Sequence, residues 1–272
     1  MIDNLASELL AFANSLADES RAILGRVSTS APAVSIKADD SFVTRTDREI
    51  EARLRERIAD RYPDHGVLGE EYGAERPGAE YVWVLDPIDG TAAFIAGIPV
   101  HGTLIGVARG GSPWLGLVDH AATGERLTGV AGHAAWFQGR RIQCRANVAL
   151  KDAFMTSSNP RFLSAEQLAK VLRLDAMVRF TQYGGSCYAY GSLARGRTDL
   201  AIDAGLEAFD IFAMAAIIEG AGGKVSDWAG AAITLDWRDE VLAAGDAALH
   251  AHVLTQLQDQ GGRESPAEGA PL

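Results

Sequence analysis

Apolar residues near the start of the chain recur every three or four positions, which is the spacing of one face of an α-helix. The residues that share this face are Ile2, Leu5, Leu9, Phe12 and Leu16. The pattern predicts an amphipathic helix that continues toward Leu24 and ends before Gly25. A second helix is predicted from Thr44, a good N-cap residue, to about residue 62. Residues 35–43, between the two helices, are predicted to form a loop or a short hairpin.

The middle of the chain alternates apolar runs with turn residues, a pattern typical of β-strands. Five apolar residues at 81–85 predict a buried strand. Residues 103–108 and 114–118 are separated by Arg-Gly-Gly-Ser-Pro, which predicts a hairpin. Further strands are expected near residues 126–130 and 134–137.

From about residue 146 the predicted strands and helices alternate, which favours an α/β unit. The predicted strands cover 153–157, 177–181 and 199–202, and the predicted helices cover 164–172, 185–195, 210–220 and 246–258. We therefore predict an N-terminal α+β half over residues 1–145 and a C-terminal α/β half over residues 146–260. Residues 261–272 are rich in Gly, Pro, Ser and Glu and are expected to be a disordered tail.

Charge and composition narrow the function. The 272 residues carry a formal net charge of −11, which argues against non-specific binding of nucleic acid. An enzyme of anionic substrates with this charge would need metal ions to supply a positive field locally. Cys144 and Cys187 are the only cysteines, too few for a disulfide framework or a thiolate zinc site. The sequence shows neither a membrane-spanning apolar run nor a signal-peptide pattern, so we expect a cytoplasmic protein without a membrane partner.

The strand predicted at 81–85 leads into the sequence Asp-Pro-Ile-Asp-Gly-Thr at 86–91. We expect Asp86 and Asp89 to lie in a turn, followed by a short helix whose first N–H groups, at Gly90 and Thr91, are free. Two carboxylates beside an anion-binding helix start suit a divalent metal that holds a phosphate. The same residues would also make an ordinary turn, because each of them is a good turn former.

Four carboxylates stand out by their positions at the ends of predicted elements, namely Glu70, Asp86, Asp89 and Asp210. An isolated Asp at a helix start is usually only a cap, and an isolated Glu at a strand end is usually solvated. Together they supply the oxygen-only ligand set of a two-metal phosphatase. Neither His nor Cys joins this set, so Mg²⁺ fits it better than Zn²⁺.

Three motifs in this order resemble the inositol monophosphatase superfamily. They are Gly-Glu-Glu at 69–71, Asp-Pro-Ile-Asp-Gly-Thr at 86–91, and Phe209-Asp210 with Glu-Gly-Ala-Gly-Gly at 219–223. Residues 37–44, with Asp47 and Glu51, resemble the upstream signature of that family. The resemblance covers about residues 5–260. It implies a layered αβαβα sandwich of two halves, with the active site of a magnesium-dependent phosphatase between them.

The resemblance also implies the metal ligands. Glu70, Asp86 and the carbonyl of Ile88 would hold one Mg²⁺. Asp86, Asp89 and Asp210 would hold a second ion, and Glu70 would help to place a third, weaker one.

The catalytic group implied by the resemblance consists of Glu70, Thr91 and Asp47. The hydroxyl of Thr91 would hydrogen-bond the attacking water and would itself be paired with Asp47. A threonine hydroxyl is a poor base, so it needs the metal and Asp47 for this task. The amides of Gly90 and Thr91 would bind phosphate oxygens.

Two longer segments, 94–105 and 184–191, resemble the histidinol-phosphate phosphatases within this superfamily. The resemblance implies histidinol phosphate as the substrate, with Ser186, Asp203 and Glu207 as substrate-binding residues. Histidinol carries an ammonium group, which Asp203 and Glu207 could balance. The subfamily usually has Asp at the position of Ser186 and Lys at the position of Glu207, so the identity of the leaving group is open.

Two other functions are compatible with these motifs. One is a phosphatase of inositol 1-phosphate or of another small polyol or nucleotide phosphate. The other is a non-catalytic metal- or phosphate-binding module, against which stands the presence of every expected ligand together with Thr91 and Asp47. In either phosphatase the partner is a small phosphorylated metabolite. Members of the family often form dimers, which leaves a homodimer open.

Overall fold

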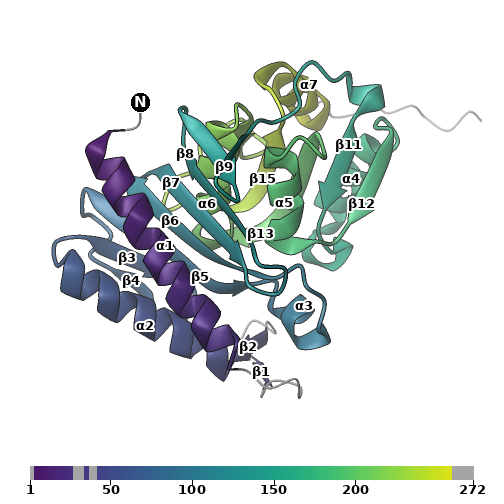
Figure 1. Ribbon diagram of the computed structural model, residues 1–272. Helices are drawn as coiled ribbons and strands as arrows, with labels where there is room; N and C mark the ends of the chain where they lie inside the picture. The colour runs from purple at the N-terminus through teal and green to yellow at the C-terminus, as the bar shows by residue number, and fades with distance from the viewer. Residues whose placement is uncertain (1–2, 27–33, 37–41, 259–272) are drawn as a thin grey trace, which may run out of the picture.

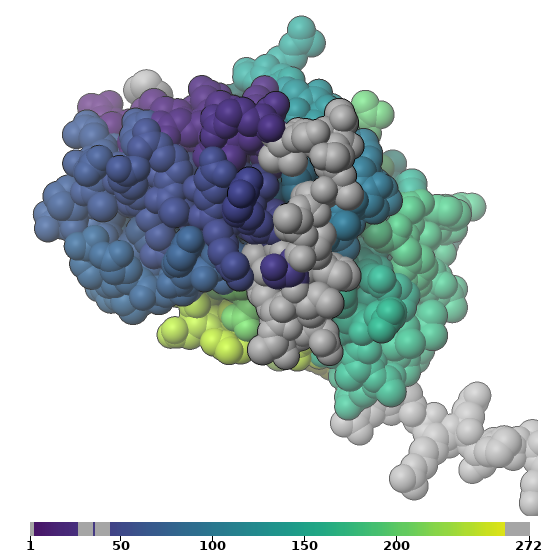
Figure 2. Space-filling model, turned by 90° about the horizontal axis from the view of Figure 1, so that it is seen from below, coloured from purple at the N-terminus to yellow at the C-terminus, as the bar shows by residue number. Residues whose placement is uncertain are grey.

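The computed structural model describes residues 3–26, 34–36 and 42–258. Residues 37–41 of the upstream motif and the predicted tail at 261–272 lie outside the described residues. The described chain forms two large sheets that alternate with three layers of helices (Figure 1). This arrangement confirms the predicted layered αβαβα sandwich. In the space-filling view, the early part of the chain (purple and blue) and the later part (green) occupy opposite sides of the same face (Figure 2).

The first sheet has eight strands in the order β10-β9-β8-β7-β6-β5-β3-β4. Their bounds are β3 (Gly66–Gly69), β4 (Gly73–Glu75), β5 (Tyr81–Asp89), β6 (Gly102–Arg109), β7 (Ser112–His120), β8 (Glu125–Val130), β9 (Ala134–Phe137) and β10 (Arg140–Ile142). Every neighbouring pair is antiparallel except β3 and β5, which are parallel. A separate antiparallel pair, β1 (Val34–Ile36) and β2 (Phe42–Thr44), confirms the short hairpin.

The second sheet has five strands in the order β12-β11-β13-β15-β14. Their bounds are β11 (Phe154–Ser157), β12 (Phe180–Tyr183), β13 (Leu200–Glu207), β14 (Lys224–Ser226) and β15 (Arg238–Ala244). Strand β11 is parallel to both β12 and β13, whereas β15 is antiparallel to β13 and β14. The sheet is therefore mixed. The division of the chain into two halves between residues 145 and 146 stays a prediction.

Apart from α3, the helices of the described chain lie in three layers around the two sheets (Figure 1). Their bounds are α1 (Asn4–Leu24), α2 (Arg45–Arg61), α3 (Thr91–Ala96), α4 (Ala165–Asp175), α5 (Ser186–Ala194), α6 (Ala208–Gly220) and α7 (Ala247–Gln258). Helices α1 and α2 cover the outer face of the eight-stranded sheet, and α4 and α7 cover the outer face of the other sheet. Helices α5 and α6 lie between the sheets. No helix among the described residues combines the length and apolar character needed to cross a membrane.

Strand β5 is apolar on both faces because helices cover both. Trp83 and Leu85 are buried in the core formed with α1 and α2. Val82 and Val84 are buried in the core formed with α5 and α6. A strand covered on both faces has a continuous apolar run rather than an alternating one.

The backbone of helix α6 packs directly against the backbone of the eight-stranded sheet. An added Cβ at Gly116 of β7 would overlap the carbonyl of Ala213, and one at Gly129 of β8 would overlap the backbone of Ile217. Glycine at these strand positions lets the helix backbone approach closely. This contact fixes α6, and with it Asp210 in its first turn, relative to β5.

Candidate metal and active site

A bulge in β5 places Asp86 and Asp89 on one face of the sheet. In a regular strand, residues three apart point to opposite faces. Here Asp86 is opposite Leu104 and Asp89 is opposite Gly102, so Pro87 and Ile88 together oppose the single residue between them on β6. The extra residue of the bulge returns the Asp89 side chain to the same face of the sheet as the Asp86 side chain. The prediction that both aspartates lie in a turn is wrong, since β5 extends through Asp89.

The third carboxylate comes from the first turn of α6. The Asp210 side chain accepts a hydrogen bond from the Glu207 amide at 2.7 Å, and the two residues form a capping box. Carboxylate oxygens of Asp86, Asp89 and Asp210 all lie within 4.8 Å of one another. The structure therefore brings together three of the four carboxylates singled out in the sequence.

Burial of this cluster makes its negative charge costly. Asp86 is 1% exposed, and its Oδ1 has no hydrogen-bond partner. Burial raises the pKa of Asp86 well above its ordinary value, and the charges of Glu70, Asp89 and Asp210 raise it further. Burial likewise raises the pKa of Asp210. Among the described residues, no Lys or Arg side chain forms an ion pair with the three clustered aspartates.

These features fit a bound divalent cation. The donors are all carboxylate oxygens, which are the ligands that Mg²⁺ prefers. The unpartnered oxygen of Asp86 is a buried acceptor, and such groups in folded proteins normally have a partner. The cluster could therefore bind a metal ion.

Glu70 follows β3, next to the cluster. Its amide donates to the Leu85 carbonyl at 3.2 Å, so in the parallel pairing of β3 and β5 it lies beside Asp86. The turn after it is held by Glu51 of α2, which is fully buried. The Glu51 carboxylate accepts from the amides of Glu71 at 2.7 Å and Tyr72 at 3.2 Å. Sequence reasoning gave Glu51 no role beyond its place in a motif. The available signal was its spacing of four from Asp47, which puts both on one buried face of a helix.

Asp47 and Thr91 are not hydrogen-bonded to each other in the described chain. Asp47 is 1% exposed, and its Oδ2 accepts from the amide of Thr44 at 2.9 Å and from the Thr44 hydroxyl. The other oxygen of Asp47 is buried without a partner, and burial raises the pKa of this carboxyl. The Thr91 hydroxyl donates to the Ile88 carbonyl at 3.1 Å. The catalytic pairing of Thr91 with Asp47 stays a prediction.

Gly90 lies where helix α5 meets the end of β5. Its φ is +76°, and an added Cβ would be 2.6 Å from the Ser186 Oγ. The amide of Cys187, in the first turn of α5, donates to the Asp89 carboxylate at 2.6 Å and opposes the rise in pKa that burial causes there. Helix α5 thus contacts the cluster directly, which the sequence did not indicate.

The three predicted substrate-binding residues differ in their surroundings. Ser186 adjoins Gly90, as described above. Asp203 is 4% exposed and accepts from the Tyr190 hydroxyl at 2.7 Å and from the Ser158 amide. Glu207 is half exposed, and its carboxylate is 3.7 Å from the Arg238 guanidinium. Their roles in substrate binding stay predictions.

Comparisons with known proteins give one consistent family. The model of the inositol monophosphatase family matches residues 5–261. The bifunctional phosphatase IMPL2 of Arabidopsis thaliana is 36% identical over 94% of this chain and 77% of that protein. A histidinol-phosphatase of Chlorobaculum parvum is 32% identical over 74% of this chain and 78% of that protein. A solved structure of an inositol monophosphatase from Zymomonas mobilis is 34% identical in sequence. Its superposition on this chain covers 94% of this chain and 99% of that chain, with a TM-score of 0.85.

Proposed function

Because this chain belongs to the inositol monophosphatase family, we propose that it is a magnesium-dependent phosphomonoesterase that hydrolyses histidinol phosphate to histidinol and phosphate. The relatives named above are phosphatases, which is consistent with a phosphoric monoester hydrolase. The observation that supports the metal-dependent chemistry is the cluster of Asp86, Asp89 and Asp210, in which Asp86 is buried and one of its carboxylate oxygens has no hydrogen-bond partner.

In this proposal the carboxylates would bind two or three Mg²⁺ ions. Glu70, Asp86 and the Ile88 carbonyl would hold one ion, and Asp86, Asp89 and Asp210 would hold another. When bound, Mg²⁺ supplies acidification of the attacking water and neutralisation of the charge on the departing alcohol. The burial of Asp86 and Asp210 supports this assignment, because it raises their pKa values and so favours a bound cation when they are ionised.

The side chains of this protein would position the water and the phosphate. A hydroxyl has one hydrogen and two acceptor lone pairs, so Thr91 can accept a hydrogen bond from water while it donates its own hydrogen to another acceptor. In the proposal the Thr91 hydroxyl would donate to the buried Oδ1 of Asp47, which has no partner in the described chain, instead of to the Ile88 carbonyl. The amides of Gly90 and Thr91, at the beginning of α3, would bind phosphate oxygens. Water would attack phosphorus directly while the bond from phosphorus to the alcohol oxygen breaks, without a covalent enzyme intermediate.

The charge around the site favours a cationic leaving group. Asp203 lies near enough to Asp89 to raise the pKa of Asp89, and Glu207 is the N-cap of the helix that carries Asp210. Both carboxylates would attract the ammonium group of histidinol. A neutral polyol gains nothing from them. Inositol 1-phosphate is nevertheless the second candidate, because the related structure from Zymomonas mobilis is named an inositol monophosphatase.

A substrate panel tests the proposal. Purified protein with Mg²⁺ should release phosphate from histidinol phosphate with a higher kcat/KM than from inositol 1-phosphate or a nucleoside monophosphate. Faster release from inositol 1-phosphate would replace the proposed substrate by the second candidate. Release from no phosphate ester would support the non-catalytic binding module. The cytoplasmic location and the homodimer stay predictions from the sequence.

A further inference from the structure

The bulge that orients the aspartates is held by a side chain on the neighbouring strand. Thr103 of β6 lies opposite Pro87 and Ile88. Its hydroxyl donates to the carbonyl of Pro87 at 2.8 Å. Thr103 is 1% exposed, so solvent does not replace this donor. The contact fixes a carbonyl located between the two aspartates in the sequence.

A second hydroxyl, from helix α1, supports Thr103. The Oγ of Ser20 is 2.6 Å from the Oγ1 of Thr103, and Ser20 is fully buried. A hydroxyl can donate only one hydrogen. The hydrogen of Thr103 goes to Pro87, so Ser20 is the donor in its bond with Thr103. The two hydroxyls form a directed chain from α1 through β6 to the bulge.

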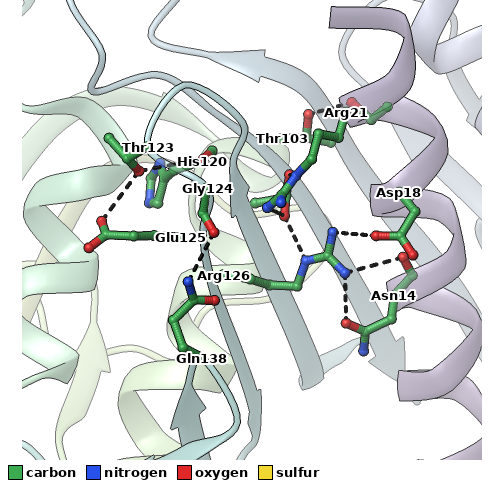
Figure 3. Close-up of polar contacts among 12 residues, drawn as sticks. Asn14, Asp18, Arg21, Thr103, His120, Thr123, Gly124, Glu125, Arg126 and Gln138 are labelled. Atoms are coloured by element: carbon green, nitrogen blue, oxygen red, sulfur yellow. Dashed lines mark hydrogen bonds and ion pairs between the residues drawn. The ribbon is translucent and has the colours of Figure 1, made fainter. Parts of the chain in front are cut away.

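The end of α1 that carries Ser20 is itself tied to the sheet. The next residue, Arg21, makes two hydrogen bonds to the Asp119 carboxylate, at 3.0 and 2.6 Å. Asp119 is 1% exposed, lies opposite Thr103 in the pairing of β6 and β7, and also accepts from Arg126 at 2.6 Å. Figure 3 shows Arg126 extending from the sheet to Asn14 and Asp18 on α1, next to Arg21. Ser20 is therefore held in place with respect to the strands.

We infer that Thr103, supported by Ser20, is a positioning residue that fixes the β5 bulge and so keeps Asp86 and Asp89 on a common face to bind metal. This inference rests on the proposed function, because it concerns the same metal site. The side chains of Thr103 and Leu104 point to different faces of β6, because they are neighbours in a strand. Leu104 belongs to the core between the sheets, so the Thr103 side chain is on the α1 side. It acts through the backbone and does not itself contribute a ligand. Without its hydroxyl, the Pro87 carbonyl would lose this donor, and bulge conformations that separate the aspartates would become more populated.

The test compares Mn²⁺ binding by variants of the full-length chain, measured by electron paramagnetic resonance of free Mn²⁺. Thr103→Val keeps the shape and removes the donor, whereas Thr103→Ser keeps the donor. Thr156→Val is the matched control, because Thr156 is a buried threonine that donates to a backbone carbonyl, that of Leu200, in the other sheet. Thermal unfolding of each variant reports the purely structural cost.

Thr103→Val should weaken Mn²⁺ binding about tenfold, the effect of losing one buried hydrogen bond, and Thr103→Ser should stay within about twofold of wild type. Thr156→Val should lower the unfolding midpoint but bind Mn²⁺ like wild type. If Thr103→Val binds Mn²⁺ as tightly as wild type, the positioning role is refuted while the proposed function stands. If wild type binds no Mn²⁺, both fail. Should Thr103→Val not fold, Ser20→Ala decides, with about threefold weaker binding expected and unchanged binding refuting the role.

Discussion

Replacing Glu51 by Gln tests how strongly a buried carboxylate of α2 holds the turn that carries Glu70. Glu51 is fully buried and accepts from two backbone amides and from the Arg55 guanidinium, the last at 2.8 Å. Glutamine has nearly the same shape, but it is neutral and one of its two terminal atoms is a donor. At least one of the three donors that point at Glu51 must then lose its acceptor.

The structure gives the magnitude of this loss. A hydrogen bond to a charged group contributes about 1.5–3 kcal/mol, and a buried donor left without an acceptor costs about 1–3 kcal/mol. We therefore expect Glu51→Gln to lower the free energy of unfolding by about 2–4 kcal/mol, a large part of the roughly 5–15 kcal/mol typical of a domain. Gly69 adjoins the same carboxylate, and an added Cβ there would overlap Glu51. The site has little room in which to rearrange.

Urea unfolding measures the stability, and the Mg²⁺ concentration at half-maximal phosphate release measures the effect on Glu70. We expect that concentration to rise about tenfold in Glu51→Gln, because one charged hydrogen bond no longer fixes the turn. Glu56→Gln is the control on the same helix, since Glu56 is 61% exposed and, among the residues that the structure describes, is paired with the neighbouring Arg53 alone. It should change stability by less than about 1 kcal/mol. Equal stability of the Glu51 and Glu56 variants would refute the reasoning.

Three further predictions follow from the site and the cores. Asp86→Asn should nearly abolish phosphate release. It should leave the metal-free unfolding midpoint at or above that of wild type, because it removes a buried carboxyl group whose pKa burial already raises. A folded variant with most of its activity would contradict this. Ser186→Asp should raise kcat/KM for histidinol phosphate about tenfold by adding a carboxylate for the ammonium, and its φ of +47° is one that Asp tolerates; unchanged kinetics would count against the pocket. His250, which is hydrogen-bonded to Ser226, has its pKa lowered to about 4 by burial and by the charge of Lys224. Between pH 6.5 and about pH 4, His250 therefore binds a proton in the unfolded chain but not in the folded chain. The free energy of unfolding should fall by about 2 kcal/mol from pH 7 to pH 5. Urea unfolding of wild type and His250→Gln at both pH values checks this, because the variant should lack that part of the fall and an identical pH dependence would disprove it.

The parts of the fold that the sequence predicted well are those with a strong local signal. Helices α1 and α2 have periodic apolar faces, and Thr44 is the N-cap of α2 as expected. Strand β5 was predicted to end at Leu85, because Asp-Pro-Ile-Asp-Gly favours a turn by local propensity. Pairing with β6 overrides that preference and extends the strand to Asp89. Strands β14 and β15 were missed, and β12 begins three residues later than predicted because α4 continues to Asp175.

The candidate site was predictable only where its residues are close in sequence or belong to a known motif. Asp86 and Asp89 stand out locally, but the approach of Asp210 came from the family resemblance. The contacts of Cys187 with Asp89, and of Thr103 with Pro87, join residues far apart in the chain. No local pattern reports such contacts, because they are fixed by how α5 packs against the end of β5 and by the register of β6.

The most direct test of the central claim is phosphate release from histidinol phosphate as a function of Mg²⁺ concentration, with protein first freed of metal by a chelator. The account predicts no release without added metal, full recovery with Mg²⁺, and no recovery in Asp86→Asn. Phosphate release by the metal-free wild-type protein at the rate seen with saturating Mg²⁺ would contradict it.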